Sequence, residues 1–183
     1  MPDHICPWWV AYSFDNPIRS FFHKPEKIFS PYLKPGMTIA DIGCGMGFFS
    51  IGLAKILKGN GTVIAIDVQQ KMLEIAQKRA KRAGVSETIT FLRSRGDTLP
   101  VDRPINFALA FWMAHETPDI ESFFSQIHLG LRQNGILFLA EPQFHVSEKQ
   151  FDSEISVAQK IGFIEEDRPN IAFSRSAVLK KNL

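Results

Sequence analysis

Short apolar segments alternate with longer amphipathic segments from residue 37 onward, and this alternation restricts the chain to very few folds. Strands that alternate with helices of roughly ten to fifteen residues pair in parallel and are joined by right-handed crossovers. Several of the strand segments are almost wholly apolar, as expected for strands covered on both faces. The pattern predicts an α/β fold with a doubly wound, mostly parallel sheet. The expected strands are Thr38–Ile42, Thr62–Asp67, Ile89–Arg93, Ile105–Trp112, Gly135–Glu141, Phe163–Arg168 and Ile171–Leu179.

Four helices are expected between these strands, and two of them are directly followed by a glycine, as is usual at a helix C-terminus. They are Phe48–Leu57, Gln69–Ala83, Pro118–Leu131 and Ser147–Ile161. Residues 1–36 differ, since aromatic residues and prolines dominate them, and they predict short helices that end in a turn at Pro35-Gly36. We therefore expect a helical, aromatic-rich N-terminal cap over residues 1–36 and a Rossmann-like domain over residues 37–183.

The strongest local signal is a glycine-rich loop that connects the first expected strand to the first helix of the domain. Gly43, Gly45 and Gly47 allow a tight turn and a close approach of a ligand to the backbone. Asp67 ends the next strand, where an acid can accept hydrogen bonds from ribose hydroxyls. In sheets of this kind, ligands bind outside the carboxyl ends of the strands, so the loop and the acid predict a nucleoside site.

Two details distinguish this loop from a nicotinamide-dinucleotide site. The fingerprint Gly-x-Gly-x-x-Gly, started at Gly43, requires a glycine at position 48, which is Phe48. Asp41 also places a negative charge beside the loop, which is unfavourable for a pyrophosphate but favourable for an ammonium group. A cofactor with a cationic amino acid at one end and a nucleoside at the other matches both acids. That cofactor is S-adenosyl-L-methionine.

Residues 39–50 and 62–73 resemble the first two motifs of class I S-adenosylmethionine-dependent methyltransferases, and the resemblance extends over about residues 36–180. It implies a seven-stranded sheet whose final strand is antiparallel. It also implies contacts with the methionine half of the cofactor from Asp41, Gly43, Cys44, Gly45 and Gly47. By the same resemblance Asp67 holds the ribose, and Val68 and Gln69 border the adenine.

The third segment departs from the family pattern. Leu99-Pro100 is present, but Ser94-Arg95 stands where many members have Gly-Asp, so the acid that usually bonds the adenine amino group is missing or displaced to Asp97. Adenine binding would then depend on backbone and apolar contacts. Arg95 either takes part in cofactor binding or faces solvent.

Ionisable residues also follow the fourth and fifth expected strands, at the edge where ligands bind. His115 and Glu116 follow the fourth, Glu141 ends the fifth, and His145 comes soon after, so the four side chains are expected to converge. A base is needed only if the acceptor must lose a proton, and histidine suits that role. His145 is the first candidate and His115 the second, the alternatives being a packing role for His115 and a helix-capping role for His145. No metal site is expected, since the spacing of these residues is not diagnostic.

Composition restricts the partners. The net charge of +2 gives no broad cationic field for nucleic acid or anionic lipid, and the two cysteines, Cys6 and Cys44, lie far apart, which suits a reducing cytoplasm. We expect a cytoplasmic enzyme without a signal peptide or membrane segment that methylates a small molecule. Its aromatic N-terminal segment is expected to serve as a lid or as the contact of a homodimer. A non-catalytic cofactor-binding protein and a nicotinamide-dependent oxidoreductase remain as alternatives.

Overall fold

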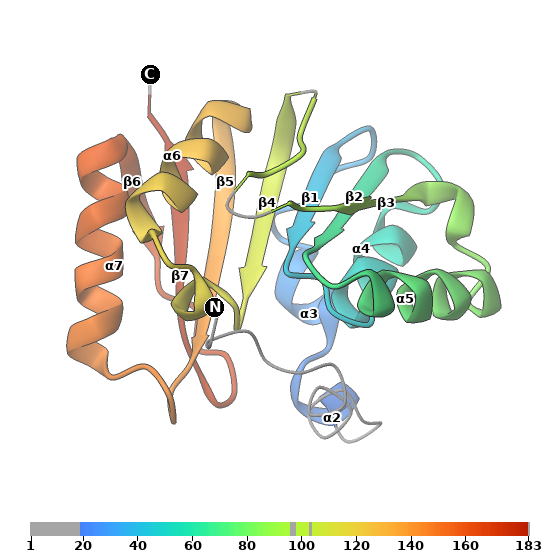
Figure 1. Cartoon of the computed structure of the whole chain (residues 1–183), viewed down its shortest axis with the longest axis horizontal. Helices are drawn as coiled ribbons and strands as arrows, with labels where there is room; N and C mark the ends of the chain where they lie inside the picture. The colour runs from blue at the N-terminus through green and yellow to red at the C-terminus, as the bar shows by residue number, and fades with distance from the viewer. Residues whose placement is uncertain (1–18, 96–97, 103, 183) are drawn as a thin grey trace.

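A computed structural model describes residues 19–95, 98–102 and 104–182 of the 183-residue chain. Within these residues seven strands form one sheet in the order β3-β2-β1-β4-β5-β7-β6 (Figure 1). The strands are β1 Thr38–Ile42, β2 Thr62–Asp67, β3 Ile89–Arg93, β4 Ile105–Phe111, β5 Leu131–Pro142, β6 Phe163–Asp167 and β7 Ser174–Lys181. The helices are α2 Arg19–Phe22, α3 Pro25–Phe29, α4 Phe48–Leu57, α5 Gln70–Arg82, α6 Ile120–Gly130 and α7 Glu148–Ile161, with 3-10 turns η1 Ser86–Thr88 and η2 Ala114–Glu116.

The pairing confirms the predicted topology. Strands β3, β2, β1, β4 and β5 pair in parallel, whereas β7 pairs antiparallel with both β5 and β6. Two apolar clusters cover the sheet. One contains Phe124 of α6 and Phe151 of α7, and the other contains Phe29 of α3 and Leu53 of α4. Because the central strands are buried on both faces, their polar residues are concentrated at the strand ends.

Side-chain caps fix the starts of the two helices that follow β4 and β5. The carboxylate of Asp119 accepts a hydrogen bond from the Ser122 backbone N–H, so α6 begins after Asp119 rather than at Pro118. Ser147 and Gln150 form a capping box at the start of α7. Both helices therefore begin at the carboxyl edge of the sheet, beside the segments that carry the predicted ionisable residues.

Six predicted strand boundaries are wrong: the ends of β5, β6 and β7 differ by one or two residues, and the other three errors lie where the backbone or a tertiary contact overrides the local pattern. Strand β5 begins at Leu131 instead of Gly135, because Leu131 is buried and pairs with Ile105 of β4. Strand β4 ends before Trp112 and β7 begins after Phe173, since these two residues have φ of +61° and +59°. A non-glycine residue in the left-handed region turns the chain and ends regular strand geometry.

The N-terminal segment is described only from Arg19 onward, so the first half of the lid or dimer contact predicted over residues 1–36, residues 1–18, lies outside the described residues. Helix α2 lies at the end of the sheet to which the arrowhead of β4 points (Figure 1). The buried His23 imidazole contacts the Ala172 carbonyl oxygen through Nε2 at 2.8 Å and anchors the end of α2 there. Helix α3 packs through the fully buried Phe29 into the apolar cluster that also contains Leu53 of α4. No helix in the described part of the chain is long and apolar enough to cross a membrane.

We predict that Phe29→Ala lowers the free energy of unfolding by roughly 3–5 kcal/mol, because it removes a fully buried ring that packs on the sheet. Phe21→Ala is the matched control, since 77% of Phe21 is exposed, and we expect it to change the free energy by less than about 0.5 kcal/mol. Urea denaturation of both variants measures the difference. Equal effects would show that α3 is not part of the domain core.

Candidate active site

The carboxyl ends of β1, β2, β4 and β5 bring the predicted ionisable segments to one edge of the sheet. The glycine-rich loop follows β1, Asp67 ends β2, and η2 follows β4. Glu141 lies near the end of β5, fully buried. The edge has two halves, one formed by the ends of β1 and β2 and the other by the ends of β4 and β5.

Among the glycines of the loop, Gly45 faces open space, whereas Gly47 faces a helix. A Cβ atom built on Gly45, whose φ is +53°, meets no atom of the described residues within 4 Å. A Cβ atom on Gly47, whose φ is +79°, would lie 2.9 Å from the Cβ of Ala76 in α5. Gly43 has its own neighbour, since a Cβ there would collide with the side chain of Met113. Gly45 is therefore the position where the loop leaves room for a ligand.

Asp67 ties the loop to the end of β2. Its Oδ2 accepts a hydrogen bond from the Gly45 backbone N–H at 2.9 Å, and its Oδ1 accepts one from the Gln69 N–H at 2.8 Å. Burial raises the pKa of Asp67, and the backbone hydrogen bonds oppose that rise. Each carboxylate oxygen has a second lone pair, so hydroxyl donors can still bind there.

Asp41 is buried behind the loop, where it contacts α4. The Ser50 hydroxyl donates to Asp41 Oδ2 at 2.5 Å, and Ser50 is itself fully buried. Burial raises the pKa of Asp41 to about 6, opposed by the hydrogen bond from Ser50 and by the charge of Arg19. The carboxyl group therefore lies between the glycine-rich loop and α4. It contributes negative potential at the methionine end of the predicted site.

Arg19 is a residue of this region that sequence reasoning missed. Its guanidinium carbon lies 4.9–5.7 Å from the centres of four aromatic rings, which is the geometry of cation–π contact. The rings belong to Phe48, Phe49, Phe111 and Trp112. The sequence gives little indication of these contacts, because the rings come from α4 and the end of β4, far from Arg19 along the chain.

The remaining predicted cofactor residues surround the same half of the edge. Cys44 is buried, and its burial raises the pKa of the thiol. Val68 and Gln69 are half-buried at the end of β2. Arg95 is exposed and forms an isolated bridge with Thr98, while Asp97, the predicted displaced acid, lies outside the described residues.

In the other half of the edge, Glu141 holds His115. Glu141 Oε1 accepts a hydrogen bond from the Ala114 N–H at 2.8 Å, and its Oε2 is hydrogen-bonded to His115 Nδ1. Burial lowers the pKa of His115, but the hydrogen bond and the charge of Glu141 outweigh it, so the net pKa is raised. The buried carboxylate thus fixes the ring orientation and leaves Nε2 as the free nitrogen of the imidazole.

His145 lies beside His115 but is held less firmly. The two rings are stacked, with centres 6.0 Å apart and planes 9° apart. His145 is exposed, and Phe144 and Trp112 continue the group of rings along the edge. The negative charge of Glu116 also raises the pKa of His115. Residues 115, 116, 141 and 145 therefore converge, yet no group of three or more His, Cys, Asp or Glu in the described ranges could hold a metal ion.

Comparisons with known proteins agree with this arrangement. The methyltransferase-domain family model matches residues 33–172. The ubiquinone/menaquinone biosynthesis C-methyltransferase UbiE of Blochmanniella pennsylvanica is 27% identical over 165 residues, covering 84% of this chain and 65% of that protein. The sterol 24-C-methyltransferase ERG6B of Gibberella zeae is 29% identical over 143 residues, covering 75% of this chain and 36% of that protein. The chain spans between 60% and 65% of the length of the UbiE proteins that it matches.

Solved structures show the same fold. The crystal structure of a SAM dependent methyltransferase from Aquifex aeolicus superimposes with a TM-score of 0.86 at 21% identity, covering 96% of this chain and 99% of that chain. The SAM-dependent O-methyltransferase from Thermotoga maritima superimposes with a TM-score of 0.71 at 18% identity, covering 87% of this chain and 65% of that chain.

We predict that Asp41→Asn raises the free energy of unfolding at pH 7 and removes part of its pH dependence. Because the pKa of Asp41 in the folded chain, about 6, lies above the ordinary value of 3.8, ionisation destabilises the fold as the pH rises from 4 through 6. The effect amounts to up to about 3 kcal/mol. Urea denaturation between pH 4 and pH 8 measures it.

Ser50→Ala is the companion variant. It removes the donor that lowers the pKa of Asp41, so the loss of stability should extend to higher pH than in the wild type. If the free energy of unfolding of Asp41→Asn changed with pH as steeply as that of the wild type between pH 4 and pH 7, the raised pKa of Asp41 would be contradicted.

Proposed function

Because the chain belongs to the class I S-adenosylmethionine-dependent methyltransferase family, we propose that it transfers a methyl group from S-adenosyl-L-methionine to a small-molecule acceptor. The observation that carries this proposal is the open space over Gly45 beside the buried Asp67 carboxylate. The absence of a side chain at Gly45 keeps the space beside the Asp67 carboxylate open to a ligand. The residues present therefore fit a nucleoside ligand that lies against the backbone.

The proposed cofactor contacts follow the geometry of the loop. Gly43, Cys44, Gly45 and Gly47 border the methionine half, and Asp67 accepts from the ribose hydroxyls. Val68 and Gln69 border the adenine, with Arg95 at its exposed rim. Asp41 acts from behind the loop, since Ser50 occupies one of its oxygens.

When bound, the cofactor supplies a methyl carbon that the neighbouring sulfonium has already activated. The protein then contributes mainly alignment and proximity. Where the acceptor must lose a proton, we propose His115 as the base, because Glu141 fixes its ring and leaves Nε2 free. This reverses the order expected from the sequence: His145, the first candidate there, becomes the second, since it is exposed and is positioned by stacking on His115.

An acceptor with an apolar body fits the surroundings of this edge. Phe22, Phe144 and Phe173 are about half exposed, and the ring of Phe22 packs against that of Phe173. The names of the relatives point the same way, since they refer to quinone and sterol methylation. We propose no nucleic acid partner, given the net charge of +2, and keep a cytoplasmic location and a homodimer through the N-terminal segment as further proposals.

The first test is cofactor affinity in a pair of glycine variants. We predict that Gly45→Ala weakens S-adenosylhomocysteine binding about tenfold or more, because the added methyl group enters the ligand's space. Gly59→Ala is the matched control: the φ of Gly59 is +78°, a Cβ there also meets no atom within 4 Å in the part of the chain that is described, and Gly59 lies before β2 at the opposite edge. Both variants should lose about 1 kcal/mol of unfolding free energy.

Isothermal titration calorimetry with S-adenosylmethionine, S-adenosylhomocysteine and NAD measures these affinities. Equal affinity of the two variants for S-adenosylhomocysteine would remove Gly45 from the site. Binding of NAD by the wild type, without a response to the other two ligands, would overturn the proposed function.

The second test is the pH dependence of methyl release in the presence of a panel of small acceptors. The wild-type rate should rise with pH through the pKa of His115, because a base must be neutral to accept a proton. Glu141→Gln should shift the profile to lower pH, since Glu141 raises that pKa. His115→Gln should abolish this rise of the rate with pH, and His145→Gln should retain it. The reverse result would make His145 the base.

A further inference from the structure

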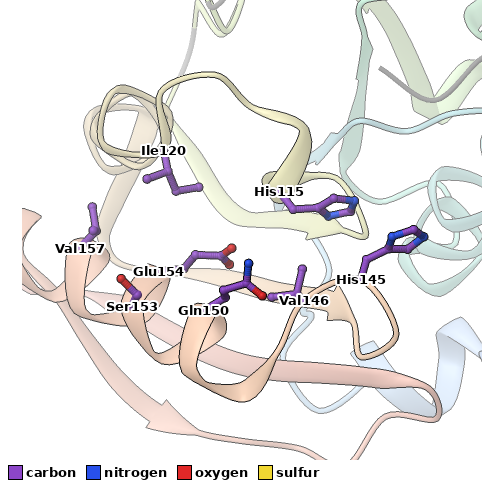
Figure 2. A pocket seen from close by; sticks show the side chains of 8 residues that line it. All are labelled: His115, Ile120, His145, Val146, Gln150, Ser153, Glu154 and Val157. Carbon is purple, nitrogen blue, oxygen red and sulfur yellow. The ribbon is translucent and has the colours of Figure 1, made fainter. Parts of the chain in front are cut away.

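A cavity of about 400 Å³ lies between η2, the start of α6 and the first turns of α7 (Figure 2). Its walls come from the segments that follow β4 and β5, so it belongs to the acceptor half of the edge rather than to the loop half. The lining residues are His115, Ile120, His145, Val146, Gln150, Ser153, Glu154 and Val157. The glycine-rich loop contributes none of them.

Glu154 is the residue of this cavity that the reasoning so far leaves unexplained. Its Oε2 atom is inaccessible to solvent and has no hydrogen-bond partner among the residues that the structure describes. Figure 2 shows the carboxyl group pointing from α7 toward the segment that carries His115 and Ile120. A carboxyl group that the protein leaves short of donors is costly to ionise, and a ligand in the cavity can lower that cost through the part of the half-buried Glu154 side chain that lines it.

The charges around Glu154 decide what kind of donor fits. Glu141 of β5 and His115 of η2 both act on it, and they are already hydrogen-bonded to each other. His145 completes the set of ionisable side chains that line the cavity. Burial and the negative charge of Glu141 raise the pKa of Glu154 to about 7, against a smaller opposing effect of His115. A cation beside Glu154 would relieve the repulsion between the two carboxylates, whereas a neutral hydroxyl would leave it in place.

The rest of the cavity suits the apolar part of such a ligand. Ile120, Val146 and Val157 supply aliphatic surface from α6, from the segment after β5 and from α7. The side chains of Gln150 and Ser153 offer further hydrogen-bonding groups along the same wall. An ammonium group on an apolar stem would meet the carboxylate with its charge and the aliphatic surface with its carbon atoms.

We infer that this cavity binds the ammonium end of an amine-bearing methyl acceptor, with the Glu154 carboxylate as its charge partner. Glu154 thereby determines specificity, while His115 beside it is available as the proton acceptor. That the bound amine is a methyl acceptor rests on the proposed function. The binding of an amine to Glu154 can nevertheless be measured without any methyl transfer.

The experiment compares n-butylamine with n-butanol and butyrate, which share the stem and differ in the head group. NMR titration of the chain labelled with ¹³C at the glutamate carboxyl carbons follows Glu154 directly. We expect n-butylamine to bind, to move the Glu154 titration to lower pH and to bind more tightly as the pH rises through about 7. Butanol and butyrate should bind at least about tenfold more weakly.

Two variants make the result specific. Glu154→Gln should weaken n-butylamine binding about tenfold or more and abolish its pH dependence. Glu148→Gln is the matched control, since Glu148 is an exposed glutamate on the same helix, and it should bind the amine as the wild type does. Thermal unfolding of both variants checks that they fold.

S-adenosylhomocysteine binding to the same three proteins separates the two proposals. Unchanged cofactor binding with loss of amine binding in Glu154→Gln supports the inference. Equal binding of butanol and butylamine, or amine binding that survives in Glu154→Gln, overturns it. Failure of the wild type to bind S-adenosylhomocysteine would overturn the proposed function and leave the amine measurement to be judged separately.

Discussion

The two backbone hydrogen bonds accepted by Asp67 are the interaction on which the rest of the site depends. They join the loop after β1 to the end of β2, through Gly45 on one side and Gln69 on the other. A buried carboxylate is costly unless it is hydrogen-bonded, and these bonds supply that compensation. They also hold Gly45 with its open side toward the ligand space. The same bonds therefore stabilise the fold and shape the proposed cofactor site.

The acids along this edge of the sheet differ in how their burial is compensated. Asp67 receives backbone donors, Asp41 receives the Ser50 hydroxyl, and Glu141 receives the Ala114 N–H and the His115 ring. In Glu154, by contrast, one buried oxygen has no donor from the part of the chain that is described. Three carboxyl groups are thus satisfied within the protein and organise it, whereas the fourth has an oxygen to which the described residues supply no donor.

The sequence predicted the doubly wound, mostly parallel sheet and most element boundaries, because apolar strands and amphipathic helices have distinct periodicities. It also predicted the loop and Asp67, since their spacing along the chain is short. It could not predict the partners of Asp41, the rings around Arg19 or the orphan oxygen of Glu154. These depend on contacts between segments far apart in the chain, such as η2 with α7, and no local pattern encodes them. The start of β5 was missed for the same reason, because Leu131 is buried through its pairing with β4.

The two halves of the edge are physically coupled through the segment that follows β4. Trp112 leaves the strand with φ of +61°, and its indole N–H donates to the Ser174 hydroxyl at 2.9 Å. The next residue, Met113, packs so closely on Gly43 that no side chain fits there. Two residues further on, His115 is bonded to Glu141. The loop after β1 and the segment that carries His115 therefore share a close-packed contact at Gly43 and Met113, which fixes the position of one segment against the other.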